Sequence, residues 1–144
     1  LQELYQNNII DFNFEGKNKV FFLKKTFEAK QYAIIAEEFK IIETIKKYPG
    51  LRDIFEKIRK NSKVSLALLF GSYAKGLSKK ESDIDIYIAT NDVSIRKEIE
   101  QINTKISLKL GTYDKNNLLI KEIEKNHVII KGVELYYDEN KFFE

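Results

Sequence analysis

The chain has 144 residues, of which 43% are hydrophobic and 33% are charged, and its formal net charge is +3. This length allows one folded domain with a small appendage, and the composition excludes both a disordered chain and a membrane-spanning one. The absence of cysteine excludes disulfide bonds and thiolate metal sites. The charge is too small to indicate nucleic-acid binding by itself, and we expect a cytoplasmic protein without a signal peptide.

Residues 1–48 predict a β-hairpin followed by a long helix. Ile9–Phe14 and Val20–Leu23 are rich in β-branched and aromatic residues, and Glu15–Asn18 between them is a turn sequence. From Thr26 to Tyr48 apolar residues recur at helical spacing, and Pro49-Gly50 ends this helix. We therefore assign 1–48 to an appendage and 49–144 to the main domain. Since the first residues resemble the tail of a helix, we expect the chain to be a fragment of a longer polypeptide.

Residues 49–144 predict an α/β domain in which helices alternate with strands. The strand over Val64–Phe70 is almost continuously apolar, which is typical of a strand covered on both faces. The strand over Asp83–Ala89 alternates between polar and apolar residues. The other predicted strands are Ile106–Leu110, Val128–Ile130 and Val133–Tyr137, and the predicted helices are Leu51–Ile58, Ile95–Ile102 and Leu118–Asn126.

The junction after the first of these strands predicts an anion-binding corner. Gly71-Ser72 follows the buried strand and leads into a short helix, whose first backbone N–H groups have no partner within the helix. Gly71 would let a phosphate approach the backbone, the Ser72 hydroxyl can donate a hydrogen bond to it, and Lys75 could add positive charge. A glycine-serine pair alone would be an ordinary turn.

A pair of carboxylates on the next strand predicts a metal site beside this corner. The two-residue period of a strand places Asp83 and Asp85 on one face, while Ile84 and Ile86 point to the other. Neighbouring carboxylates repel each other unless a cation lies between them, and Mg²⁺ or Mn²⁺ suits oxygen ligands of this kind. The natural joint ligand of the corner and the two acids is therefore a metal-bound nucleoside triphosphate.

Taken together, these residues resemble the DNA polymerase β superfamily of nucleotidyltransferases. Gly71-Ser72 and Asp83-Ile84-Asp85, separated by residues 73–82, match the spacing of its signature, and Gly71–Gly76 with Ser82 before the acids is similar to the minimal nucleotidyltransferases of prokaryotes. The resemblance implies a mixed sheet flanked by helices, in which Gly71, Ser72, Lys75 and Ser82 contact the nucleotide and Asp83 and Asp85 hold metal.

The implied reaction is attack by an acceptor hydroxyl on the α-phosphorus of ATP, with transfer of AMP and release of pyrophosphate. Minimal nucleotidyltransferases often act as antitoxins that modify a HEPN-type ribonuclease, which implies a protein acceptor; a small molecule such as an aminoglycoside is the other class. Active members also supply a third carboxylate from a later strand. The corresponding strand, Ile106–Leu110, has none, Lys109 is expected near the site face, and Asp114 is the nearest substitute.

The missing acid leaves a second hypothesis open, namely a regulator whose nucleotidyltransferase domain has decayed and now binds nucleotide or DNA. The hairpin and long helix resemble the end of a winged helix-turn-helix domain, in which Lys17 and Lys19 at the hairpin tip would contact DNA phosphate. Tyr73 and Tyr87 could stack on a base, although burial is the commoner role of such tyrosines. We interpret His127 as structural.

Overall fold

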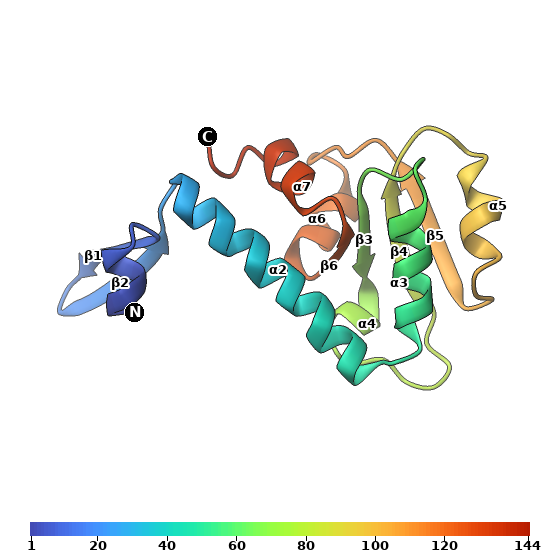
Figure 1. Ribbon diagram of the computed structural model, residues 1–144, viewed down its shortest axis with the longest axis horizontal. Helices are drawn as coiled ribbons and strands as arrows, with labels where there is room; N and C mark the ends of the chain where they lie inside the picture. The colour runs from blue at the N-terminus through green and yellow to red at the C-terminus, as the bar shows by residue number, and fades with distance from the viewer.

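A four-stranded mixed sheet forms the centre of the main domain in the computed structural model, which describes residues 1–144 (Figure 1). The strands are β3 (Ala67–Phe70), β4 (Ile84–Ala89), β5 (Ile106–Gly111) and β6 (Val128–Lys131), in the order β5-β4-β3-β6. β4 and β5 run parallel, whereas β3 is antiparallel to both of its neighbours. The predicted mixed sheet flanked by helices is therefore confirmed.

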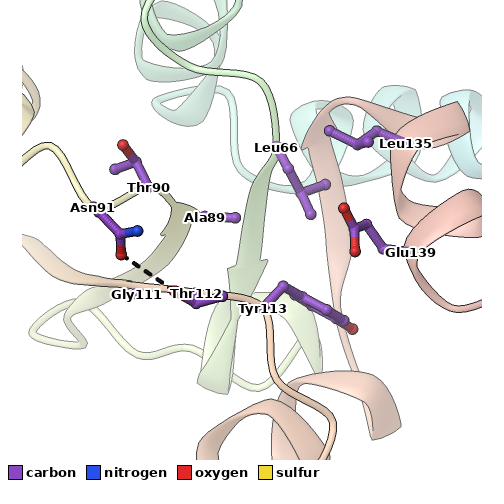
Figure 2. A pocket seen from close by; sticks show the side chains of 9 residues that line it. All are labelled: Leu66, Ala89, Thr90, Asn91, Gly111, Thr112, Tyr113, Leu135 and Glu139. Carbon is purple, nitrogen blue, oxygen red and sulfur yellow. Dashed lines mark hydrogen bonds between the residues drawn. The ribbon is translucent and has the colours of Figure 1, made fainter.

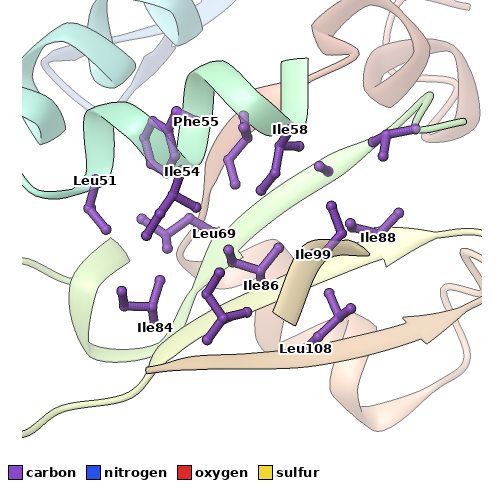
Figure 3. Packing of buried hydrophobic residues seen from close by; sticks show 14 of the residues in the cluster. Leu51, Ile54, Phe55, Ile58, Leu69, Ile84, Ile86, Ile88, Ile99 and Leu108 are labelled. Carbon is purple, nitrogen blue, oxygen red and sulfur yellow. The ribbon is translucent and has the colours of Figure 1, made fainter. Parts of the chain in front are cut away.

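One face of the sheet carries the larger hydrophobic core and is covered by α3 (Leu51–Lys60) and α5 (Ile95–Glu100). Ile84, Ile86 and Ile88 alternate along β4 and point into this core, opposite α3 (Figure 3). Fully burying one such side chain contributes roughly 1.5 to 3 kcal/mol. The alternation that fills this core also fixes the direction of the intervening residues Asp85 and Tyr87, which lie on the other face.

The opposite face is covered only in part, by α6 (Leu118–Lys125) and α7 (Val133–Glu139). These helices pack over Leu68 of β3, Tyr87 of β4 and Ile129 of β6 in a second core cluster. Lys109 of the edge strand β5 is exposed on this face. An open area of the sheet therefore remains beside β5.

The last predicted strand, Val133–Tyr137, is wrong, because this segment forms helix α7. Gly132 has φ +88°, a left-handed conformation that ends β6 and lets the chain turn into the helix. Within α7, Val133 and Tyr136 are buried at helical spacing. The β-branched and aromatic composition of this segment is also typical of a strand, so composition alone pointed to the wrong element.

The N-terminal part consists of α1 (Gln2–Gln6), the hairpin β1 (Ile10–Glu15) and β2 (Asn18–Leu23), and the long helix α2 (Phe27–Lys47). The predicted hairpin is confirmed, and Gly16 in its turn has φ +63°. At one end of α2, Ala29 packs with Ile9 and Ile10; at the other, Ile41 joins the main core. The assignment of 1–48 to a separate appendage remains a prediction. None of the helices combines the length and hydrophobicity required to cross a bilayer.

Candidate active site

The predicted phosphate corner lies where β3 ends and the one-turn helix α4 (Gly71–Ala74) begins. Gly71 has φ +68°, which favours glycine, and no side chain caps the helix. The first amides of a helix have no intrahelical partners, so those of Gly71 and Ser72 are available to an anion. The helix C-terminal end is fixed by Lys47 of α2, whose Nζ donates a hydrogen bond to the Gly76 carbonyl at 2.7 Å.

Asp85 lies directly against this corner. It pairs with Phe70 in the antiparallel register of β3 and β4, so its side chain is next to Gly71. A Cβ at Gly71 would overlap the Asp85 carboxylate oxygen Oδ2, and it would come within 3.0 Å of Cγ and 3.3 Å of Cβ of the same residue. The close approach of backbone and carboxylate therefore requires glycine at position 71.

The surroundings of Asp85 disfavour the charged form of its carboxyl group. Partial burial raises the pKa of the Asp85 carboxyl above its ordinary value, and the negative charge of Asp83 raises it further. Lys109 and a hydrogen bond donated by the Ser107 hydroxyl lower it, but they do not reverse the shift. Asp83 itself is exposed immediately before β4. A cation placed between the two carboxylates would remove this repulsion.

Ser107 occupies the position at which β5 could supply a third carboxylate. It is the register partner of Asp85 in the parallel β4–β5 pair. Lys109, two residues further along the same face, is close enough to Asp85 to affect its pKa, as the sequence led us to expect. Asp114 lies beyond Gly111, which pairs with Ala89 at the opposite end of the sheet, so it cannot substitute. No group of three or more His, Cys, Asp or Glu side chains is arranged to hold a metal ion.

A comparison with protein families agrees with this geometry. The family described as Polymerase beta, Nucleotidyltransferase matches residues 52–140, which is more than half of the chain and includes every predicted site residue. The chain belongs to this family. No curated protein shows significant similarity to it.

Two predicted ligands of this nucleotidyltransferase, Lys75 and Ser82, have other contacts in the structure. Lys75 is exposed at the end of α4, with its Nζ 3.9 Å from Oε1 of Glu122 on α6. The Ser82 hydroxyl accepts a hydrogen bond from the Lys79 amide at 2.8 Å, which closes a turn in the loop before β4. A role for either residue in nucleotide binding remains a prediction, whereas the Asp85 carboxylate lies directly against Gly71.

The remaining residues singled out in the sequence have structural contacts. Tyr73 packs edge to face against Tyr48, with ring centroids 4.9 Å apart, and Tyr87 is buried in the second core cluster. His127 lies beside Tyr136, and its Nδ1 is 2.9 Å from the Ile123 carbonyl oxygen. Burial lowers the pKa of the His127 imidazole, which favours its neutral form. These contacts agree with the interpretation of His127 as structural.

Two hollows flank the sheet of the nucleotidyltransferase domain. A groove of about 500 Å³ opens next to Ile84, and the cationic residues Lys47 and Lys105 line it together with Asn103. A smaller pocket of about 220 Å³ lies at the other end of the sheet, between Thr112 and Glu139 (Figure 2). Neither hollow is lined by Asp83 or Asp85. The sequence analysis did not predict Lys105 or Ser107 as site residues, because their positions depend on the pairing of β5 with β4.

Proposed function

We propose that the protein transfers a nucleoside monophosphate, AMP from ATP, to an acceptor hydroxyl and releases pyrophosphate in a Mg²⁺-dependent reaction. Membership in a nucleotidyltransferase family supports nucleotidyl transfer in general. The observation that carries the specific proposal is the contact between the Asp85 carboxylate and the Gly71 corner, with Asp83 close enough to raise the Asp85 pKa. Metal ligands and phosphate donors then act on the same bound nucleotide.

The residues of the corner have distinct roles in this proposal. Gly71 lets the Asp85 carboxylate lie against the backbone, and the Ser72 amide and hydroxyl donate hydrogen bonds to a phosphate. Asp83 and Asp85 hold Mg²⁺ or Mn²⁺, and the phosphates supply the further oxygen ligands, as is usual for nucleotide-bound Mg²⁺. The metal would neutralise charge on the phosphates during in-line displacement. Lys75 and Ser82 are proposed as further contacts to the nucleotide.

The acceptor is proposed from the resemblance to minimal nucleotidyltransferases, which points to a protein hydroxyl on a HEPN-type ribonuclease. The protein would then act as an antitoxin that inactivates its partner by AMP transfer. The exposed position of Asp83, immediately before β4, supports an acceptor that approaches from solvent.

A second candidate function, a nucleotide-binding or DNA-binding regulator, is favoured by the residues on β5. Ser107 stands where a third carboxylate would, and Lys109 places a positive charge on the face that a second metal ion would occupy. Such a site would bind Mg²⁺ and nucleotide with little or no transfer. In this case the hairpin, with Lys17 and Lys19 near its tip, would belong to a winged-helix domain that binds DNA.

The test is transfer of label from α-labelled ATP in the presence of Mg²⁺ and candidate acceptors, including a HEPN-type protein. We expect label on the acceptor with the wild type and none with Asp83→Ala or Asp85→Ala. Asp114→Asn is the matched control, because it removes one carboxylate charge at the opposite end of the sheet and should leave transfer unchanged. Transfer that survives the double Asp83→Ala, Asp85→Ala substitution would refute the proposed site.

A further inference from the structure

The outer surface of α2 carries an exposed row of large apolar side chains. Tyr32, Ile35, Phe39 and Ile42 are 45%, 61%, 57% and 51% exposed, and Figure 1 shows one side of the helix without any covering element. The neighbouring row of the same helix, which includes Ile41, packs against the sheet. Surface helices normally place polar residues on the face away from the core. α2 is therefore apolar on two faces, and one of them has no partner.

The spacing of the exposed row is that of a short coiled-coil seam. The four apolar residues follow one another at intervals of three, four and three, which matches the alternating a and d positions of heptads. The same spacing extends by four residues to Glu28 at the N-terminal end and to Lys46 at the C-terminal end. Both charged residues are exposed. Opposite charges therefore lie at the two ends of the seam, and the rise of an α-helix places them about 27 Å apart along the helix axis.

We propose that this seam, from Glu28 to Lys46, binds the same seam of a second copy of the chain in an antiparallel pair. In an antiparallel pair related by a two-fold axis, each a position meets a d position of the other copy, so Tyr32 packs with Ile42 and Ile35 with Phe39. Glu28 of each copy then meets Lys46 of the other. A parallel pair would instead place Glu28 against Glu28 and Lys46 against Lys46.

Glu28 and Lys46 therefore favour the antiparallel orientation of the two helices, and they favour a second copy of the chain as the partner. A single helix already favours an acid at its start and a base at its end because of its dipole. The helix dipole would be satisfied by charges on any side of the helix. Glu28 and Lys46 nevertheless both lie in line with the apolar row. Within one copy, Lys46 is paired with Glu43 and Glu28 accepts a hydrogen bond from Asn8, both at exposed positions. A second copy matches the apolar row and brings Glu28 to Lys46 at both ends, because the row reads the same in either direction about position 37.

The exposed area predicts a weak, reversible dimer. Four half-exposed large side chains offer on the order of 400 to 500 Å² per copy, against roughly 800 Å² per partner in a stable interface of standard size. We therefore expect a dissociation constant in the micromolar range. Analytical ultracentrifugation over a concentration series should show a monomer–dimer equilibrium.

The first test replaces the centre of the seam. The variant Ile35→Ser, Phe39→Ser should remain monomeric at concentrations where the wild type dimerises. The control variant Val93→Ser, Leu118→Ser removes two exposed apolar side chains outside α2 and should dimerise like the wild type. A wild type that stays monomeric at several hundred micromolar would overturn the proposal, as would a dimer that is unaffected by the seam substitutions.

The second test determines the orientation and leaves the apolar row intact. The chain has no cysteine, so Glu28→Cys and Lys46→Cys introduce single thiols. Under mild oxidation a mixture of the two variants should give the mixed disulfide dimer, while each variant alone should give little. Homodimers of Glu28→Cys would contradict the antiparallel arrangement.

Charge reversal gives an independent check. Glu28→Lys and Lys46→Glu should each weaken dimerisation roughly five- to tenfold, because two exposed ion pairs become repulsive. The double variant should restore the wild-type constant. Failure of the double variant to restore it would contradict the pairing of Glu28 with Lys46.

Discussion

Gly71→Ala tests the contact between the phosphate corner and Asp85 through protein stability. A left-handed conformation costs a non-glycine residue about 1 to 2 kcal/mol, and Gly71 has φ +68°. The new methyl group would also overlap the Asp85 carboxylate and approach its Cβ to 3.3 Å, and overpacking of this kind costs about 1 to 3 kcal/mol. We therefore expect a total loss of about 2 to 5 kcal/mol in the free energy of unfolding.

Two other variants separate the contributions of backbone strain and overlap. Gly16→Ala introduces the same left-handed strain at φ +63°, but nothing lies within 4 Å of its Cβ, so it should cost only about 1 to 2 kcal/mol. Adding Asp85→Ala to Gly71→Ala removes the overlapping carboxylate. The double variant should recover at least about 1 kcal/mol relative to the sum of the single changes, as expected for residues in contact.

The measurement is denaturant unfolding monitored by circular dichroism, with each variant compared at the same pH. At this chain length each kcal/mol corresponds to a change of roughly 3 to 4 °C in Tm, which provides a second readout. If Gly71→Ala costs no more than Gly16→Ala and shows no coupling to position 85, the close contact at the corner is wrong.

Three further predictions concern the same sheet. Asp85→Asn should stabilise the protein by about 0.5 to 1 kcal/mol at neutral pH. Folding raises the pKa of Asp85, so the folded state holds this proton more tightly than the unfolded state does, and the wild type loses stability as the pH rises from the ordinary aspartate pKa to the raised one. The gain from Asp85→Asn should therefore vanish in acid. Thermal unfolding at several pH values would measure this dependence. Ser107→Asp should lower Tm in the absence of metal, because like charges at paired positions of adjacent strands cost up to about 1 kcal/mol. The same substitution should increase the stabilisation of the protein by Mg²⁺. An unchanged response to Mg²⁺ would argue against Ser107 as the position of the missing acid. Gly132→Ala should lower the free energy of unfolding, measured with denaturant, by about 3 kcal/mol or more. Gly132 has φ +88°, and a Cβ there would overlap the Ser65 carbonyl oxygen and approach the Cα of Leu66 to 3.3 Å. A smaller loss would mean that the chain adjusts at this turn.

The parts of the fold that follow from local patterns were predictable from the sequence. The alternation along β4 determined which residues enter the core and placed Asp83 and Asp85 on the other face. The glycine-serine junction after an apolar strand predicted the turn from β3 into α4. The last element was not predictable in this way, because its β-branched and aromatic residues suit a strand as well as a helix.

Features that depend on pairing between distant segments could not be read from the sequence. Only the register of β4 and β5 shows that Ser107 faces Asp85, and only the direction of β5 shows that Asp114 lies at the other end of the sheet. Likewise, the helical spacing of apolar residues in α2 did not show that Phe39 is exposed while Ile41 is buried. Strand order and helix packing decide each of these cases.

Calorimetric titration of ATP in the presence and absence of Mg²⁺ tests the central claim most directly, because it does not require a known acceptor. The wild type should bind ATP with an affinity that depends on Mg²⁺, and the variant Asp83→Asn, Asp85→Asn should lose that dependence while remaining folded. Mg²⁺-dependent binding that persists in the double variant would contradict a site formed by these two aspartates at the Gly71-Ser72 corner.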